Sequence, residues 1–306
     1  MKVLIVASYN LGYFAAFITE QAAALENLGC EVKLFGISKS GVMGYLQEIP
    51  RLRKEIRSFE PNVIHAHFGL SCMFSNIATR KIPIVSTYHG SDINLPKLRC
   101  ISELAMSLSA WNIFVSNSTL DKIPKFFLKN SSLVPCGIDL SNDQLLSKIQ
   151  AREILGWNTK EKKVLFAGRF NDRMKDAKLA KETISLIDKV ELIELKGYTR
   201  REVNYLMCAV DCLLLTSIAE ASPQVVKEAM ACGCPIVSVD VGDVAERTSG
   251  VEGCFVVPTR NPKDIATAVE TAISFEGKTN GRKKIIEYGL TNELVAKRLM
   301  QIYEQL

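Results

Sequence analysis

The sequence predicts an α/β protein made of two doubly wound, Rossmann-like domains. With 306 residues, the chain is long enough for two domains of about 150 residues each. Short apolar runs alternate with stretches of helical periodicity, a pattern typical of parallel sheets covered on both faces. The two halves also open alike: Val3-Leu-Ile-Val-Ala-Ser is followed by Gly12, and Val164-Leu-Phe-Ala-Gly168 is followed by Arg169.

The expected strands are short apolar runs bounded by polar or turn-forming residues. In the first half they are Val3–Ser8, Glu31–Ile37, Val63–Phe68, Ile84–Tyr88, Asn112–Ser116 and Ser132–Pro135. In the second half they are Lys163–Gly168, Glu191–Lys196, Cys212–Thr216, Pro235–Val239 and Cys254–Val257. We place the first domain at residues 1–142 and the second at 143–285, with a polar linker near Leu140–Lys162. Residues 286–306 are expected to form a final amphipathic helix.

The composition is that of an ordinary soluble protein, with 47% hydrophobic and 23% charged residues. No apolar run approaches the roughly 18–20 residues that span a bilayer. The nine cysteines show no zinc-site spacing, and we interpret the apolar ones as reduced core residues in a reducing compartment. We therefore expect a cytoplasmic protein.

The net charge of +5 is modest, and the densest basic stretch of the first half is Arg51–Arg57. Its simplest interpretation is a solvated helix face. The alternative is attraction to anionic lipid, which leaves open a peripheral contact with the inner face of the membrane. Nucleic-acid binding is not expected, because aromatic residues do not interleave the basic runs.

The most informative segment runs from Glu220 to Ser238 and contains a clearly marked helix. Ser222 is a good N-cap, and Pro223 suits the first helical position because its missing N–H would be unpaired there. Gly233 and Pro235 end the helix.

This helix start separates two carboxylates that lie eight positions apart, Glu220 in the loop and Glu228 in the helix. The amides of Gln224, Val225 and Val226 are expected to be free between them, and free amides at a helix start bind anions. Glu228 lies roughly 7–8 Å along the axis from the helix start, a plausible span from a diphosphate to a ribose. A nucleotide sugar would fit the whole element. The simpler alternative is two solvated glutamates beside an ordinary helix.

The segment Glu220-Ala-Ser-Pro-Gln-Val-Val-Lys-Glu228-Ala-Met-Ala-Cys-Gly-Cys-Pro closely resembles the donor-binding signature of family-four retaining glycosyltransferases, which have the GT-B fold. That signature runs roughly E-G-x-P-x-x-x-x-E-A-M-A-x-G-x-P-V-V. This chain departs from it at Ala221, where many members have glycine. It departs again at Asp243, where a second glycine often follows Gly242, so the turn after Asp240 is expected to be less flexible.

Weaker matches follow in family order. Val164-Leu-Phe-Ala-Gly168-Arg169 is similar to the strand, glycine and arginine that open the second domain, and Lys175 is the nearest candidate for a lysine that usually follows. Ser86-Thr-Tyr-His89-Gly-Ser-Asp92 resembles the acceptor-side histidine loop. Val134-Pro-Cys-Gly-Ile-Asp139 is similar to the N-G-V-D segment before the interdomain linker. By analogy with GT-B proteins, the last helix is expected to return to the first domain.

The resemblance implies transfer of a sugar, with retention of configuration, from a nucleoside-diphosphate sugar to an acceptor hydroxyl. No two aspartates form an Asp-x-Asp motif, so we expect no metal and no cofactor, and a UDP-sugar is the favoured donor. Arg169 and Lys175 are the candidate positive groups for the leaving diphosphate. The resemblance further implies that Glu220 holds the donor sugar and Glu228 the ribose. Gly168, Ser222 and Pro223 are expected to shape the donor site.

In the first half, the resemblance places His89 near the reacting carbon. His65 and His67 alternate in a strand-like run, so we expect at most one to face the core and interpret both as structural. Asp92 is either an acceptor contact or an N-cap. Gly12 either lets the backbone approach a ligand or is a plain turn residue.

Ligands of parallel sheets bind at the carboxyl ends of the strands, and His89, Gly168, Arg169 and Glu220 all follow expected strands. We therefore expect them to face one cleft. The expected acceptor is a glycan, a lipid-linked sugar or a small molecule, in cell-surface polysaccharide synthesis. Two alternatives are a nucleotide-sugar 2-epimerase and a non-catalytic GT-B partner subunit.

Overall fold

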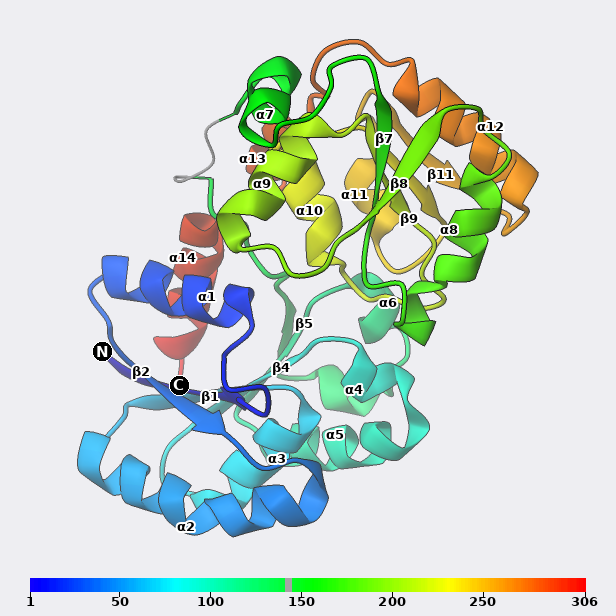
Figure 1. The fold of residues 1–306 in the computed structure, drawn as a ribbon. Helices are drawn as coiled ribbons and strands as arrows, with labels where there is room; N and C mark the ends of the chain where they lie inside the picture. Colours follow the sequence, from blue (N-terminus) through cyan, green and yellow to red (C-terminus); the bar gives the residue numbers. More distant parts are fainter. Residues whose placement is uncertain (141–144) are drawn as a thin grey trace. The chain divides into compact units, whose positions relative to one another are not determined.

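The computed structural model describes residues 1–140 and 145–306. It divides into two compact units, one formed by Met1–Gly137 with Leu290–Leu306 and the other by Ile138–Gly289. Each unit contains one parallel sheet with helices on both faces (Figure 1), so the predicted fold class is confirmed. The expected domain boundary at residues 142 and 143 lies outside the described residues.

The first unit has a six-stranded sheet in the order β2-β1-β3-β4-β5-β6, and all of its strand pairs are parallel. The central strands β3 and β4 are completely buried, because helices cover them on both faces. The strands are β1 (Lys2–Ser8), β2 (Glu31–Ile37), β3 (Val63–His67), β4 (Ile84–Tyr88), β5 (Trp111–Phe114) and β6 (Ser131–Leu133).

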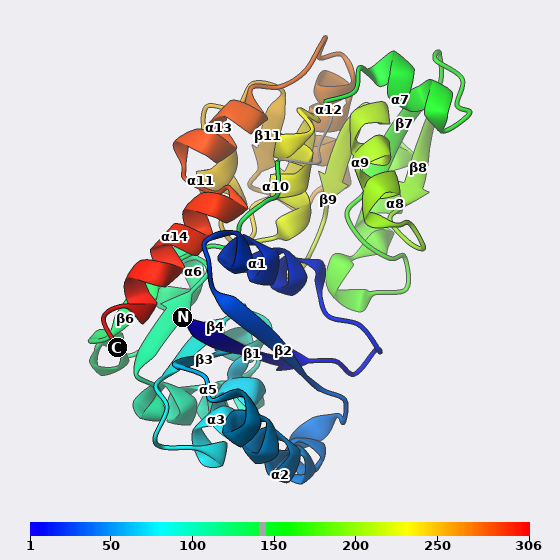
Figure 2. The same ribbon diagram turned by 90° about the vertical axis from the view of Figure 1, so that its left-hand side faces the viewer.

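Helices α1 (Ala16–Asn27) and α14 (Asn292–Tyr303) lie side by side on one face of this sheet (Figures 1 and 2). Leu25 of α1 and Leu299 of α14 are buried in the same apolar cluster as Ile5 of β1. The other face carries α2 (Gly41–Phe59), α3 (Gly69–Ala78) and α5 (Pro96–Leu108). The short α4 (Ser91–Asn94), α6 (Asn117–Leu120) and η1 (Lys125–Leu128) complete the unit. The last helix is therefore part of the first unit's core.

The second unit has a five-stranded parallel sheet in the order β11-β10-β9-β7-β8. Its strands are β7 (Lys162–Phe166), β8 (Val190–Glu194), β9 (Cys212–Leu215), β10 (Ile236–Val239) and β11 (Cys254–Val257). Its helices are α7 (Lys148–Ile154), η2 (Arg173–Lys175), α8 (Ala177–Ile184), α9 (Arg200–Ala209), α10 (Gln224–Ala231), α11 (Val244–Thr248), α12 (Pro262–Ile273) and α13 (Gly281–Glu287). Helices α8 and α12 bury one face of the sheet, with Leu179 and Val269 packed on Val164 and Leu214.

Each expected strand is present, and the differences lie at the ends. Strand β5 stops at Phe114 rather than Ser116, because the Ser116 hydroxyl caps α6 by accepting the N–H of Thr119. The expected C-terminal helix, residues 286–306, corresponds to α14, and it begins later than expected because residues 286 and 287 still belong to α13. Gly289 has a φ of 65° and ends α13, and Thr291 caps α14 by accepting the N–H of Leu294.

One buried carboxylate ties the start of the second unit to its sheet. Asp211 accepts hydrogen bonds from Arg152 Nη2 at 2.9 Å, from Lys148 Nζ at 2.8 Å and from the backbone N–H of Lys163 at 2.7 Å. The Arg152 and Asp211 side chains are 2% and 3% exposed. Removing one partner of such a pair leaves the other charge buried without compensation.

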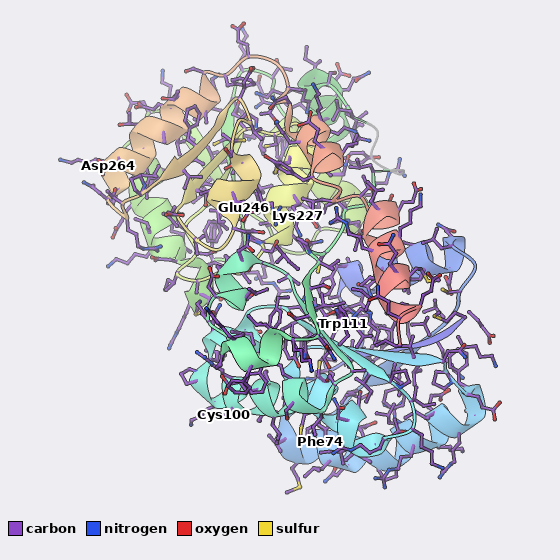
Figure 3. All side chains as sticks on the ribbon, turned by 180° about the vertical axis from the view of Figure 1, so that it is seen from behind. Phe74, Cys100, Trp111, Lys227, Glu246 and Asp264 are labelled. Carbon is purple, nitrogen blue, oxygen red and sulfur yellow. The ribbon has the colours of Figure 1, made fainter. Side chains whose placement is uncertain are left out.

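We expect Asp211→Ala to lower the free energy of unfolding of the second unit by about 3–5 kcal/mol, because Arg152 keeps its charge in the interior. The chain has two tryptophans, Trp111 in β5 of the first unit (Figure 3) and Trp157 in the second. Urea unfolding followed by Trp157 fluorescence in a Trp111→Phe background measures the effect. Asp188→Ala removes an exposed carboxylate of the same unit and is the matched control, with an expected change within about 0.5 kcal/mol. Equal effects of the two substitutions would contradict the prediction.

Candidate functional site

The proposed donor element follows β9 in the second unit. Helix α10 begins at Gln224, with Pro223 in the N-cap position at φ −66° and ψ 118°. The prediction that Ser222 caps this helix is therefore wrong. Its buried hydroxyl has no hydrogen-bond partner among residues 1–140 and 145–306. The start is shifted by one residue because Pro223 keeps extended backbone angles instead of entering the first turn.

The amides at this helix start are not all available. The N–H of Val226 donates to the carbonyl of Pro223 at 3.2 Å, so the expectation that it is free is wrong. Gln224 and Val225 occupy the first two helical positions. A ligand contact through their amides stays a prediction.

The turn after β10 packs tightly against the loop of Glu220. The N–H of Asp243 donates to the carbonyl of Ala221 at 3.0 Å. Gly242 has a φ of 62°, and a Cβ there would lie 2.7 Å from the same carbonyl oxygen. Asp243, the departure from the family signature, accepts a hydrogen bond from Arg247 Nε at 2.9 Å. A side chain at Asp243 therefore stabilises α11 without disturbing the glycine that the close approach requires.

Three of the predicted site residues meet at the carboxyl end of this sheet. Lys175 Nζ lies 2.5 Å from Glu220 Oε1, and both side chains are largely buried. Gly168 lies directly against the Lys175 side chain, since a Cβ at this position would be 2.6 Å from Lys175 Cγ. Arg173 and Lys178 are basic residues close to Lys175 in the sequence. In the structure Lys178 faces Glu182 instead, at 3.8 Å.

The backbone of η2 is held firmly, which fixes Lys175. The Thr216 hydroxyl donates to the carbonyl of Lys175 at 2.9 Å or to that of Asp176 at 3.0 Å. The N–H of Ile218 donates to the carbonyl of Met174 at 2.9 Å. Both donors follow β9, so hydrogen bonds join the loop that carries Lys175 to the loop that carries Glu220. Such preorganisation is what electrostatic stabilisation of a leaving group needs.

Arg169 follows Gly168 and is exposed. Across the described part of the chain, no ion pair of its side chain is found. The next residue, Phe170, donates its N–H to Glu194 Oε1 at 2.7 Å, which holds this loop against the end of β8. Arg169 is therefore a solvated cation on an anchored loop.

Glu228 lies on α10 and forms an ion pair with Arg200 at the start of α9. The two residues line a small hollow together with Asn204, Met207 and Cys232. Sequence reasoning missed Arg200. The sequence feature that could have pointed to Arg200 is the capping box from Thr199 to Glu202, which places Arg200 in the first turn of α9.

In the first unit, His89 joins His65 and His67 in one row. His65 and His67 stack with ring centroids 4.4 Å apart, and His67 and His89 stack at 5.2 Å. His67 Nδ1 lies 3.0 Å from His89 Nε2. The expectation that at most one of His65 and His67 faces the core is wrong. Residues i and i+2 of a strand share a face, and both side chains are completely buried.

Burial dominates the titration of this row. It lowers the pKa of His65 to about 3. It also lowers the pKa of His67 well below its usual value, and the neighbouring His65 and His89 add to this effect. Both rings are therefore neutral at pH 7.

Asp92 organises the loop around His89 through backbone contacts. Its carboxylate accepts the N–H groups of Gly90 at 2.8 Å, His89 at 3.0 Å and Gly69 at 3.1 Å. Burial raises the pKa of Asp92 to about 6, and these three N–H groups oppose that rise. Asp92 lies inside α4 and so is not an N-cap. It lines an open cavity at the carboxyl ends of β1, β3 and β4, together with Ser8, Asn10, Phe68, Gly69 and Ser91. The acceptor role stays a prediction.

Gly12 lies in an exposed turn after β1. Its φ is 78°, and its N–H donates to the carbonyl of Tyr9 at 3.0 Å. The turn itself requires this glycine, and a ligand contact at Gly12 stays a prediction. The shared cleft of His89 with Gly168, Arg169 and Glu220 would need both units and also stays a prediction.

Residues 1–140 and 145–306 contain no group of three or more His, Cys, Asp or Glu side chains placed to hold a metal ion. They also contain no helix that combines the length and the apolar character needed to cross a bilayer.

We expect the first unit to lose stability as the pH falls below about 6.5. The unfolded chain protonates His65 near pH 6.5, whereas the folded chain does so only near pH 3. Neutral His65 thus makes its full contribution to the free energy of unfolding above pH 6.5. This contribution decreases as the pH falls, by about 1.4 kcal/mol per pH unit. The raised pKa of Asp92 has the opposite effect, because the folded chain takes up a proton at Asp92 below about pH 6 before the unfolded chain does, and this stabilises the folded state.

Comparing wild type with His65→Gln isolates the contribution of His65, since Asp92 is present in both proteins. Urea unfolding between pH 4.5 and 7.5, followed by Trp111 fluorescence in a Trp157→Phe background, gives the slope of the free energy of unfolding against pH for each protein. We expect this slope to be steeper in wild type. Identical slopes would show that His65 is protonated equally in both states.

Comparison with known proteins gives consistent matches along the chain. Residues 25–142 match the model described as Glycosyltransferase Family 4, and residues 142–274 match that described as Glycosyl transferases group 1. The putative teichuronic acid biosynthesis glycosyltransferase TuaC of Bacillus subtilis is 28% identical over 219 residues. This match covers 62% of the present chain and 56% of TuaC, so the chain spans little more than half of that relative.

Two solved structures are similar in fold over the whole chain. Sucrose-phosphate synthase from Thermosynechococcus elongatus has a TM-score of 0.83 and 16% identity, covering 99% of this chain and 98% of that one. Anabaena HepE in complex with UDP has a TM-score of 0.75 and 16% identity, covering 100% of both chains. The two family matches are contiguous, and both sheets have the GT-B arrangement of strands and helices. The chain therefore belongs to the family-four glycosyltransferases with the GT-B fold.

Proposed function

We propose that this protein is a retaining, metal-independent glycosyltransferase. It moves a sugar from a nucleoside-diphosphate sugar, with a UDP-sugar favoured, to a hydroxyl of an acceptor. The acceptor is a glycan, a lipid-linked sugar or a small molecule in the synthesis of a cell-surface polysaccharide. No metal ion and no cofactor take part.

The observation that carries this proposal is the ion pair between Lys175 and Glu220 at the start of α10. A helix start attracts the diphosphate, and Lys175 adds a fixed positive charge. Lys175 Nζ has three donors, so it can keep Glu220 in place and still contact a phosphate oxygen. Glu220 is then positioned to accept hydrogen bonds from the donor sugar.

The proposed reaction proceeds on one face of the sugar. The bond from the anomeric carbon to the diphosphate oxygen breaks, and the acceptor oxygen bonds to the same face of that carbon. The acceptor proton passes to the departing phosphate, so no separate base is required. Lys175 and Arg169 stabilise the leaving negative charge, and Glu220 stabilises the positive charge on the ring.

Glu228 is proposed to accept the ribose hydroxyls, and Arg200 orients its carboxylate. Gly168 leaves the space that Lys175 occupies. His89 is proposed to contact the donor sugar or the acceptor. Asp92 lines the cavity of the first unit, which is proposed to take the acceptor.

The named relatives support the choice of substrates. HepE has been solved with UDP and with UDP and glucose, which favours uracil as the base. The name of TuaC refers to teichuronic acid biosynthesis, which favours a surface polysaccharide as the product. We propose a cytoplasmic location, with peripheral contact at the inner face of the membrane where a lipid-linked acceptor would lie.

Nucleotide binding tests the donor site directly. Calorimetric titration with UDP, GDP and ADP in the presence of a chelator is expected to show micromolar binding of UDP. Glu228→Ala is expected to weaken it about tenfold or more, because a hydrogen bond to a charged group is lost. Glu252→Ala removes an exposed carboxylate of the same unit and is the matched control. Unchanged UDP affinity in Glu228→Ala would refute the ribose role.

Lys175→Met is expected to lower kcat about 10²–10³-fold, as for loss of one group that stabilises a leaving charge. Lys178→Met is the matched control, because Lys178 is three residues away but faces Glu182. Initial rates of sugar transfer at saturating donor give both values. Equal loss in the two variants would mean that charge in general, rather than Lys175, supports the reaction.

Product analysis separates the alternatives. Retention of the anomeric configuration in the product supports the proposed mechanism. Change of the donor sugar without any acceptor would favour a 2-epimerase. Tight nucleotide binding without turnover, over a broad set of acceptors, would favour a non-catalytic partner subunit.

A further inference from the structure

The three histidines of the chain lie in one row, in which His65 and His67 are buried and His89 is half-buried. Gln21 of α1 and Tyr303 of α14 contact this row. The hydrogen bonds among these groups allow each ring proton to be assigned. A neutral imidazole has one N–H donor and one acceptor nitrogen, and the neighbours decide which is which.

The amide of Gln21 starts the assignment. Its Nε2 lies 3.3 Å from His65 Nδ1 and 3.3 Å from His67 Nε2. An amide NH₂ group has two donors and no acceptor. Both ring nitrogens are therefore acceptors, and the protons of His65 and His67 lie on the opposite nitrogens.

The surroundings of His65 agree with this assignment. The Tyr303 hydroxyl lies 2.5 Å from His65 Nδ1, and burial raises the pKa of Tyr303 well above its usual value, so the phenol keeps its proton and can donate. His65 Nε2 lies 2.7 Å from the Thr87 hydroxyl, which can accept the Nε2 proton. The single lone pair of His65 Nδ1 is therefore taken mainly by the closer Tyr303 hydroxyl, and the amide of Gln21 at 3.3 Å shares it weakly.

The contact between His67 and His89 determines which ring nitrogen of His89 carries the proton. With its proton on Nδ1, His67 donates to His89 Nε2 across 3.0 Å. His89 Nε2 must then be an acceptor. Its own proton lies on Nδ1, which is 3.7 Å from the sulfur of Cys136. Asp92 bonds the backbone N–H of His89, which fixes the position of the residue without influencing the choice of ring nitrogen.

We propose that Gln21, acting through His67, fixes His89 as the Nδ1–H tautomer, so that His89 serves as a neutral hydrogen-bond donor through Nδ1. Its Nε2 is occupied by His67, so it is not a general base at that nitrogen. Gln21 and His67 are positioning residues. The consequence for turnover rests on the proposed function, whereas the tautomer itself does not.

The direct test is nitrogen NMR of the full-length protein labelled with ¹⁵N-histidine, at pH 7.5 and without ligand. Only three rings contribute signals, and His65→Gln and His67→Gln assign them. We expect Nδ1–H for His67 and His89 and Nε2–H for His65. An Nε2 proton on His89 in the wild-type protein would overturn the proposal.

Gln21→Glu gives a sharper test, because a carboxylate only accepts hydrogen bonds. When His67 stays neutral, which the shifts of its two ring nitrogens report, its Nε2 donates to the carboxylate, its Nδ1 becomes an acceptor, and the proton of His89 is expected to move to Nε2. A doubly protonated His67 would instead keep its Nδ1 proton and leave His89 unchanged, so the role of Gln21 is judged from the neutral form. Gln21→Met, of similar length but without polar atoms, is expected to give a mixture of tautomers. Unchanged tautomers in both variants would overturn the role of Gln21.

Gln47→Glu makes the same chemical change on the exposed side of α2 in the same unit and is the control. We expect it to leave the histidine signals and the turnover unchanged. Gln21→Glu is expected to lower kcat about 10–100-fold, as for other partners that fix a tautomer, with the KM of the donor unchanged. A normal kcat with a shifted tautomer would refute the role in turnover. If even the wild-type protein transfers no sugar, the proposed function fails, while the NMR result still decides the tautomer.

Discussion

Both sheets contain only parallel strands, and this constraint decides where the candidate residues lie. Parallel strands end at one edge, where their loops collect side chains from distant parts of the sequence. In the second unit this brings Gly168 after β7 and Glu220 after β9 to the same edge. In the first unit it brings Gly12 after β1 and His89 after β4 to the corresponding edge. Each loop is short, so the rigid sheet rather than the loop sets the position.

The strands could be predicted because each is a short, largely apolar run bounded by polar or turn-forming residues. The ends of helices were harder, since several residues compete there. At α10, Ser222 and Pro223 both suit a helix start. In the structure Pro223 is the N-cap, because its backbone stays extended. At the C-terminus, the expected start at residue 286 fell in the last turn of α13, whereas α14 begins at Asn292. Gly289 and Thr291 mark the break between the two helices.

The candidate site was predictable as a set of positions, but not as a set of contacts. Glu220 and Lys175 were identified separately, and their ion pair depends on the fold that places η2 beside the end of β9. The pairing of Glu228 with Arg200 joins residues on two helices, which no local pattern contains. The histidine row was misjudged for a different reason. Alternation on a strand puts His65 and His67 on the same face, and partners from α1 and α14 make their burial tolerable.

The two candidate sites handle polar side chains differently, and each way suits its proposed task. The site in the first unit contains neutral imidazoles that satisfy one another, because a buried imidazolium without a counter-ion would be costly. The site in the second unit pairs formal charges at a partly exposed edge of the sheet, as Lys175 with Glu220. A diphosphate that arrives beside Lys175 meets a cation already held in place by a carboxylate. Its charge is then stabilised without the reorientation that water would require, which is the advantage of a preorganised site.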